Sequence, residues 1–234
     1  MTLERRSAMA TLLADRGDDL LVIPGLGSTA WDAAAAGDND QNFYLWGAMG
    51  GAAMIGLGLA MAQPGRRVAV ITGDGEMLMG LGALATIGAK CPPNLAIIVF
   101  DNGVYGETGM QPSHTQAGVD LIGVAAACGI PSRLDVKSEN ELADLAYRLK
   151  NLRETLFARV QIAADEPPRV LPMRDGVALK QRFRASLGLR PQASARRWGV
   201  LDSVDSSLYN ARASLSGPPG PARRPGSSVG RAHD

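Results

Sequence analysis

The chain has 234 residues, of which 46% are hydrophobic and 20% are charged, and its net charge is +1. This length and apolar content suffice for a large hydrophobic core, and they exclude a disulfide-stapled mini-protein, a collagen-like repeat and a fully disordered chain. Aromatic residues make up only 5%, whereas 28 residues are glycine. Such a composition suits α/β packing, in which small residues let helices approach a sheet.

The charge is unevenly distributed along the chain. Residues 1–179 carry 14 basic and 20 acidic side chains, whereas residues 180–234 carry 10 basic and 3 acidic ones. Residues 190–234 are also rich in proline, serine and arginine and lack hydrophobic periodicity, so we predict a folded domain over 1–189 and a disordered extension over 190–234. A basic tail is able to contact nucleic acid or an anionic membrane, but we favour a solvated end and expect no nucleic-acid partner.

Three features predict a cytoplasmic protein without a membrane segment. The first 19 residues lack the apolar run of a secretory signal. The most apolar stretch, residues 49–62, is too short to span a bilayer, which needs about 20 residues. Cys91 and Cys128 lie far apart without neighbouring ligands for zinc or an iron–sulfur cluster, so we expect two reduced thiols.

Strand and helix patterns alternate along the folded part. In chain order, a first helix includes Glu4, and we then expect strands at 20–23, 43–46, 67–72, 94–100, 132–136 and 156–162. We expect a turn at 25–27 with a helix cap at Ser28 or Thr29, helices at 49–61, 76–89, 119–128 and 138–149, and a long loop at 103–118. Ser138 and Glu141 form a predicted capping box. This order predicts a doubly wound, mostly parallel α/β sheet with helices on both faces.

Two neighbouring strands of this sheet end in polar, glycine-containing turns. Asp74 lies in the turn GDG that follows the strand at 67–72, and Asn102 follows the strand at 94–100. One βαβ unit separates them, so both are expected at the carboxyl edge of the sheet, where ligands bind. A carboxylate and an amide oxygen suit Mg²⁺ bound jointly with phosphates, although GDG alone is also an ordinary tight turn.

The spacing GDG–x26–N resembles the thiamine diphosphate signature of the pyrophosphate-binding domain of thiamine-dependent enzymes. The segment from FYLWGAMGG to QPSHT, within a similarity over residues 3–189, resembles the branch typified by sulfopyruvate decarboxylase beta subunits and phosphonopyruvate decarboxylases. The resemblance implies thiamine diphosphate and Mg²⁺ as cofactors.

The resemblance also assigns expected roles to individual residues. It makes the side chains of Asp74 and Asn102 and the main-chain carbonyl of Val104 the metal ligands. It implies that the thiamine diphosphate is held by Gly47, Met49, Gly73, Gly75, Glu76, Met77 and Tyr105, in addition to the metal ligands. Met49 would lie under the cofactor rings as an apolar, adaptable side chain, although simple core packing is the alternative.

The loop 105–115 is expected to face the substrate. His114 is the candidate catalytic residue, as a proton donor or a binding group for an acid, although a lone loop histidine is more often unengaged. Thr108, Gln111 and Thr115 are further candidates. The activity that the resemblance implies is decarboxylation of a 2-oxo acid, with the thiazolium ring of the cofactor accepting the electrons.

We expect the chain to supply only half of an active site. In the family, a glutamate on a separate pyrimidine-binding domain activates the cofactor, and neither Glu4 nor Glu76 is placed to do so. The expected partner is therefore an alpha subunit in a hetero-oligomer, although the isolated chain can also form homodimers. The alternatives are an acetolactate synthase-like carboligase, a 2-oxo acid oxidoreductase subunit, and a non-catalytic flavodoxin-like binding module.

Overall fold

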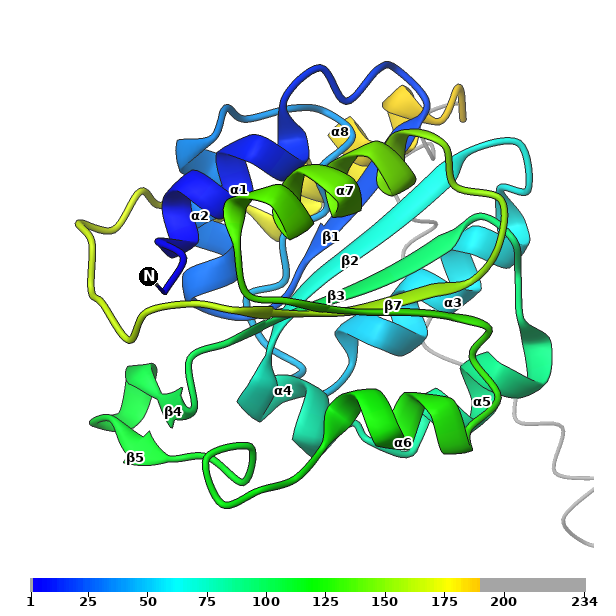
Figure 1. The fold of residues 1–234 in the computed structure, drawn as a ribbon. Coiled ribbons are helices and arrows are strands. Elements are labelled where there is room, and N and C mark those ends of the chain that lie inside the picture. The colour runs from blue at the N-terminus through cyan, green and yellow to red at the C-terminus, as the bar shows by residue number, and fades with distance from the viewer. Residues whose placement is uncertain (1, 190–234) are drawn as a thin grey trace, which may run out of the picture. The chain divides into compact units, whose positions relative to one another are not determined.

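The computed structural model describes residues 2–189, and a five-stranded parallel sheet forms its centre (Figure 1). The strands follow one another across the sheet in the order β1 (Leu20–Pro24), β2 (Arg67–Gly73), β3 (Leu95–Asp101), β7 (Leu156–Gln161) and β6 (Ser132–Val136). The predicted strands at 20–23, 67–72, 94–100, 132–136 and 156–162 therefore form, and the predicted parallel α/β fold is confirmed.

Helices cover both faces of the sheet (Figure 1). One layer consists of α1 (Arg5–Leu13), α2 (Ser28–Ala35) and α7 (Glu139–Lys150). The opposite layer consists of α3 (Ala52–Ala62), α4 (Asp74–Met79), α5 (Ala83–Lys90) and α6 (Leu121–Ala127). A last helix, α8 (Gly176–Ser186), contributes Leu179 to one core cluster and Phe183 to the other.

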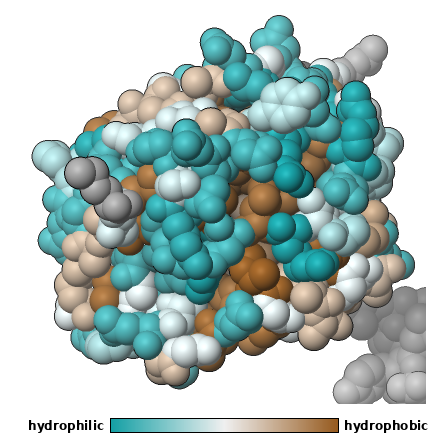
Figure 2. Space-filling view, viewed as in Figure 1, coloured by the Kyte–Doolittle hydropathy of each residue, from teal (hydrophilic) through white to brown (hydrophobic). Residues whose placement is uncertain are grey.

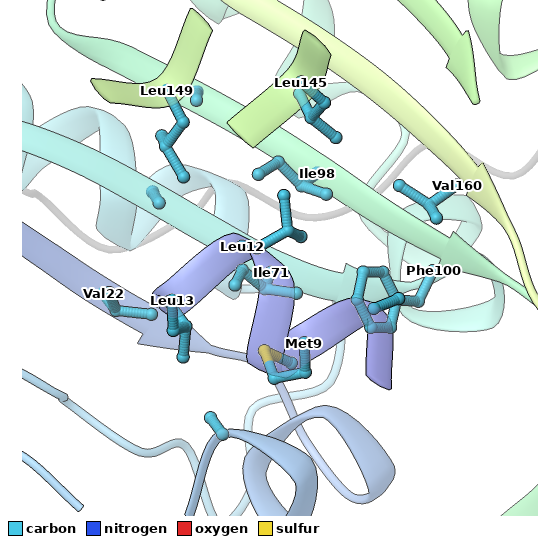
Figure 3. Close-up of a cluster of buried hydrophobic side chains, with 14 of the residues drawn as sticks. Met9, Leu12, Leu13, Val22, Ile71, Ile98, Phe100, Leu145, Leu149 and Val160 are labelled. Carbon is cyan, nitrogen blue, oxygen red and sulfur yellow. The ribbon is translucent and has the colours of Figure 1, made fainter. Parts of the chain in front are cut away.

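Two apolar clusters, one on each face of the sheet, form the core. All seven residues of β3 are buried, which explains its continuous apolar run. Figure 3 shows Met9, Leu12 and Leu13 of α1 packed on the same face as Ile71 and Ile98 of the central strands. From the side of Figure 1, the outer surface is mainly hydrophilic, with hydrophobic residues gathered in a band across it (Figure 2).

The capping box at the start of α7 forms as predicted. The N–H of Glu141 donates to Ser138 Oγ at 3.4 Å, and the N–H of Lys137 donates to Glu141 Oε2 at 2.8 Å.

The single helix predicted over 76–89 is wrong, because α4 and α5 are separate helices. The chain between them passes so close to the turn before α3 that a Cβ on Gly80 would lie 2.2 Å from the main-chain oxygen of Gly50. Only a glycine permits this approach, which places the segment that carries Met49 beside the C-terminal end of α4.

The segment 43–46 and the helix start at 49 also differ from the prediction. Residues 43–46 form no strand. The N–H of Phe43 nevertheless donates to Val22 O at 2.9 Å, so the start of this segment lies beside β1. Helix α3 begins at Ala52 because Gly50 adopts a φ of +86°, which leaves Met49 in the preceding turn. The predicted helix cap at Ser28 or Thr29 is wrong, because both residues lie inside α2, and the capping residue is Gly27, which makes no side-chain cap.

The predicted loop at 103–118 contains a small hairpin, in which β4 (Val104–Tyr105) pairs antiparallel with β5 (Gln111–Pro112) around a 3-10 turn at Gly106–Thr108. Helix α8 was not expected; its capping signal is Asp175, whose Oδ1 accepts from the N–H groups of Val177 and Ala178. Within residues 2–189, no helix is long and apolar enough to cross a bilayer. The predicted extension 190–234 lies outside the described residues.

Candidate functional site

A cleft of about 400 Å³ opens at the carboxyl ends of β2 and β3, within the size range of small-molecule and cofactor sites. The two strands pair directly, with Gly73 opposite Phe100, so the residues after both strands reach the same edge of the sheet. Asp74 and Asn102 both line the cleft.

The cleft brings together most of the residues that the sequence singled out. The predicted residues that line it are Met49, Gly73, Asp74, Gly75, Glu76, Asn102, Val104, Tyr105 and Thr108. The others lie outside its lining. Met77 is buried in the core, and Gly47 is exposed two residues before Met49. Gln111 is exposed on β5 of the hairpin, and His114 is exposed just after the hairpin. Thr115 lies outside the lining but contacts Asp74.

Asp74 is a buried carboxylate with only 2% of its surface exposed. Its Oδ2 accepts a hydrogen bond from Ser113 Oγ. Burial raises the pKa of Asp74, the hydrogen bond from Ser113 opposes this rise, and the nearby charge of Asp101 adds to it. The carboxylate is thus held in position, in a place where a cation would relieve its charge.

Thr115 joins the two acids at this edge. Its hydroxyl lies 2.8 Å from Asp101 Oδ1 and 3.1 Å from Asp74 Oδ2. A hydroxyl has one hydrogen, so it can donate to only one of them at a time. The sequence reasoning missed Ser113 and Asp101. Ser113, just after β5, donates to the Asp74 carboxylate, whereas Asp101 at the end of β3 contacts Thr115 and adds negative charge.

Asn102 turns the chain at the end of β3. Its Oδ1 accepts from the N–H of Val104 at 3.1 Å, which leaves a second lone pair on the same oxygen. Asn102 therefore shapes the start of the hairpin, and it also lines the cleft.

Glu76 contributes its side chain, and not only its backbone, to the floor of the cleft. Its Oε2 accepts from Thr72 Oγ1 at 2.7 Å and from the N–H of Leu26 at 3.1 Å. A Cβ on Gly25 would lie 2.0 Å from this oxygen, so the turn after β1 packs tightly on the carboxyl group. Burial raises the pKa of Glu76, and the hydrogen bond from Thr72 opposes the rise.

The two glycines of the GDG turn differ in their surroundings. A Cβ on Gly75 would lie 2.4 Å from the ring of Tyr105, so the ring packs on the backbone of the turn. A Cβ on Gly73 would meet no atom within 4 Å, so the backbone there borders open space in the cleft. An open main chain at a helix start suits the approach of a phosphate group.

The donor set fits Mg²⁺. Over residues 2–189, no three His, Cys, Asp or Glu side chains gather in a way that could hold a metal ion. The cleft offers instead one buried carboxylate, one amide oxygen and main-chain carbonyls, the hard oxygen donors that Mg²⁺ prefers when phosphates complete its ligands. The excess negative charge around Asp74 and Asp101 also favours a divalent cation.

A second wall of the cleft was not expected from the sequence. It consists of Trp31 on α2 and the segment 165–169 that follows β7. The guanidinium carbon of Arg169 lies 4.4 Å from the centre of the Trp31 ring. No motif marks these residues, because they are far apart in the chain.

Comparison with known proteins agrees with this arrangement. The model of the thiamine pyrophosphate enzyme C-terminal TPP-binding domain matches residues 27–159, which include both strand ends of the cleft. The chain belongs to the thiamine pyrophosphate enzyme family.

Several named proteins are similar to this member of the thiamine pyrophosphate enzyme family. A phosphonopyruvate decarboxylase of Streptomyces viridochromogenes is 45% identical over 82% of this chain and 48% of its own length. A sulfopyruvate decarboxylase subunit beta of Methanocaldococcus jannaschii is 34% identical over 70% of this chain and 85% of its own length. The chain thus spans about half the length of the first relative.

The fold agrees with the family as well. An X-ray structure of a putative thiamin diphosphate-dependent enzyme from Mycobacterium smegmatis superimposes with a TM-score of 0.60 at 20% identity. The match covers 70% of this chain and 32% of that one.

Proposed function

We propose that this chain is the thiamine diphosphate- and Mg²⁺-binding subunit of a 2-oxo acid decarboxylase that acts on sulfopyruvate or phosphonopyruvate. The observation that carries the proposal is the buried Asp74 carboxylate, which shares a cleft with Asn102 and with the open backbone of Gly73. The relatives named as phosphonopyruvate and sulfopyruvate decarboxylases support the reaction and the substrate class.

The residues of the cleft then have distinct tasks. Asp74, Asn102 and the main-chain carbonyl of Val104 hold Mg²⁺. The main chain of Gly73, Gly75 and Glu76 binds the diphosphate, and Met49, which is 38% exposed, supports the cofactor rings. The cofactor, when bound, supplies a thiazolium ring that accepts the electrons released when carbon dioxide leaves.

The hairpin and its turn line the cleft through Val104, Tyr105 and Thr108. Tyr105 packs on the Gly75 backbone and fixes one end of the hairpin. Thr108 Oγ1 donates to Gln111 Oε1 at 2.9 Å, which fixes the other end. His114 is exposed just beyond it and is proposed as a proton donor or acid-binding group once the site is complete.

We further propose that an alpha subunit completes the site in the cytoplasm. The similarity to a protein named subunit beta over 85% of its length supports a partner chain. Trp46, which is 40% exposed and lies outside the cleft lining, offers apolar surface for such a partner. The partner would carry the glutamate that activates the cofactor.

Titration calorimetry of the full chain with thiamine diphosphate, with and without Mg²⁺, tests the cofactor site. We expect Mg²⁺-dependent binding that is weakened at least about 100-fold in Asp74→Ala, because a charge-assisted contact and a metal ligand are both lost. Asp144→Asn, on the outer face of α7, is the control and should bind normally. Equal binding by Asp74→Ala and wild type would refute the proposed clamp.

The reaction is tested by carbon dioxide release after co-expression with the partner. Sulfopyruvate, phosphonopyruvate and pyruvate are compared as substrates, and product analysis separates decarboxylation from ligation. Release from the first two substrates only in the presence of the partner is expected. Full activity of the chain alone would contradict the proposed half-site.

A further inference from the structure

The cleft contains more negative than positive charge. Five of its lining residues are acidic, namely Asp74, Glu76, Glu107, Asp165 and Glu166, and two are arginines, Arg5 and Arg169. A substrate with a second acid group therefore needs a cation in the cleft that is not already neutralised.

Arg5 does not meet this requirement. It is 5% exposed, and its Nε lies 3.1 Å from Asp32 Oδ2 and 3.8 Å from Asp165 Oδ1. Its buried ion pair with Asp32, a carboxylate that also accepts hydrogen bonds from Arg6, connects α1 to α2, so this guanidinium is already engaged in the packing of the fold.

Arg169 differs in its partners. Its guanidinium stacks over the ring of Trp31, whose own surface is 9% exposed. Stacking orients the planar group while its N–H donors at the edge remain able to bind an oxyanion in bidentate fashion. Its acidic neighbour is Glu107, with Nη2 and Oε2 3.7 Å apart, which is too long for a hydrogen bond.

Glu107 itself occupies a place suited to an anion. It belongs to the 3-10 turn of the hairpin, and a Cβ on Gly27 would lie 3.0 Å from its Oε1. Gly27 is the capping residue of α2 and makes no side-chain cap, so the carboxylate lies beside the N-terminal end of α2, where the helix dipole favours an anion, and it faces Arg169 as its basic neighbour.

We propose that Arg169, oriented by Trp31, binds the terminal sulfonate or phosphonate of the 2-oxo acid, and that this oxyanion displaces Glu107 from its place beside Arg169. The inference rests on the proposed function and deepens it, because it names the residue that selects substrates with a second acid group. Both substrate classes share a tetrahedral oxyanion, which a guanidinium binds through paired hydrogen bonds.

The test uses unreactive analogues and the full chain loaded with thiamine diphosphate and Mg²⁺. Calorimetry measures the affinities for 3-sulfopropanoate, 3-phosphonopropanoate and butanoate, and the two diacids show which oxyanion is preferred. Wild type is expected to bind at least one diacid about tenfold or more tightly than butanoate. Arg169→Gln should lose this preference, whereas Glu107→Gln should strengthen diacid binding several-fold.

A matched control comes from the neighbouring arginine. Arg174 lies 5.9 Å from the ring of Trp46 and outside the cleft lining, so Arg174→Gln should keep the diacid preference. Arg169→Gln should also bind thiamine diphosphate as wild type does. If the wild type does not bind thiamine diphosphate, the proposed function is contradicted. If it binds the cofactor but shows no preference for the diacids, or if the preference survives in Arg169→Gln, only the role of Arg169 is overturned.

Discussion

A series of side-chain contacts extends from β6, at the edge of the sheet, to the Asp74 carboxylate of the candidate site. Arg159 on β7 binds Asp135 on β6 through two hydrogen bonds, at 2.8 and 2.9 Å, and its Nη1 lies 3.8 Å from Asp101 Oδ2. Asp101 in turn contacts Thr115, which contacts Asp74. The position of the Asp74 carboxylate thus depends on residues that never touch the cleft.

The pair of Asp135 and Arg159 makes stability depend on pH. Partial burial by itself raises the pKa of Asp135, but the hydrogen bonds from Arg159 and Lys137 outweigh burial and hold the pKa below its usual value. Because the folded-state pKa is the lower one, the pair stabilises the fold above the unfolded-state pKa of about 4, and this contribution is lost as the pH falls through the folded-state pKa.

Asp135→Asn should therefore lower the free energy of unfolding by about 1–2 kcal/mol at pH 7, and the deficit should shrink below about pH 4. Urea unfolding of both proteins at several pH values measures this. Asp144→Asn, which removes an exposed pair with Arg148, should cost less than about 0.5 kcal/mol and serves as control. A deficit that stays constant down to pH 2 would contradict the assigned ion pair.

At the scale of the elements, small residues decide how closely α3 approaches the sheet. A Cβ on Gly56 would lie 2.1 Å from Val70 Cγ2 on β2, whereas a Cβ on Gly58, two residues further, would meet no atom within 4 Å. The glycine-rich pattern at 49–61 predicted a buried helix. It did not indicate that Gly56 packs on the sheet whereas Gly58 borders open space.

The two glycines of α3 therefore predict opposite effects of the same substitution. Gly56→Ala should destabilise the protein by about 1–3 kcal/mol, because the added methyl group overpacks the contact with Val70. Gly58→Ala should stabilise it by about 0.4–1 kcal/mol, because the unfolded chain loses conformational freedom. Denaturant unfolding measures both, and equal stability of the two variants would show that α3 does not pack as tightly as described.

At the scale of the whole molecule, the proposed cofactor couples binding to stability. The cleft joins β2, β3 and the segments after β1, β3 and β7, so a ligand bound there would hold parts of the fold that are distant in sequence. A ligand that binds only the folded state stabilises it by about 2.7 kcal/mol at 100 times its Kd.

Thiamine diphosphate with Mg²⁺, at 100 times its Kd, should therefore raise the Tm by about 5–10 °C for a domain of this size. Thermal unfolding followed by circular dichroism measures the shift. Thiamine without its diphosphate should give little shift, and Asp74→Asn should lose most of the effect. A full shift in Asp74→Asn would remove the carboxylate from the proposed clamp.

Local patterns in the sequence determined the five strands of the central sheet and placed Asp74 and Asn102 at the ends of β2 and β3, but they also predicted a strand at 43–46 that does not form, and they missed the hairpin of β4 and β5. The apolar runs of β2 and β3 predict fully buried strands, and parallel strands joined by one helix bring their carboxyl ends to one edge, so this part of the site follows from local patterns. The spacing of GDG and Asn102 carried the family resemblance.

Only the tertiary structure decided the contacts between distant segments. It placed β7 between β3 and β6, separated α4 from α5 where Gly80 meets Gly50, and brought Arg169 over Trp31. The physical reason is that the hydrophobic pattern of a helix or strand indicates which of its residues are buried, but not which residues of other elements they contact. Which distant residues meet depends on how the loops close and how the helices pack on the sheet.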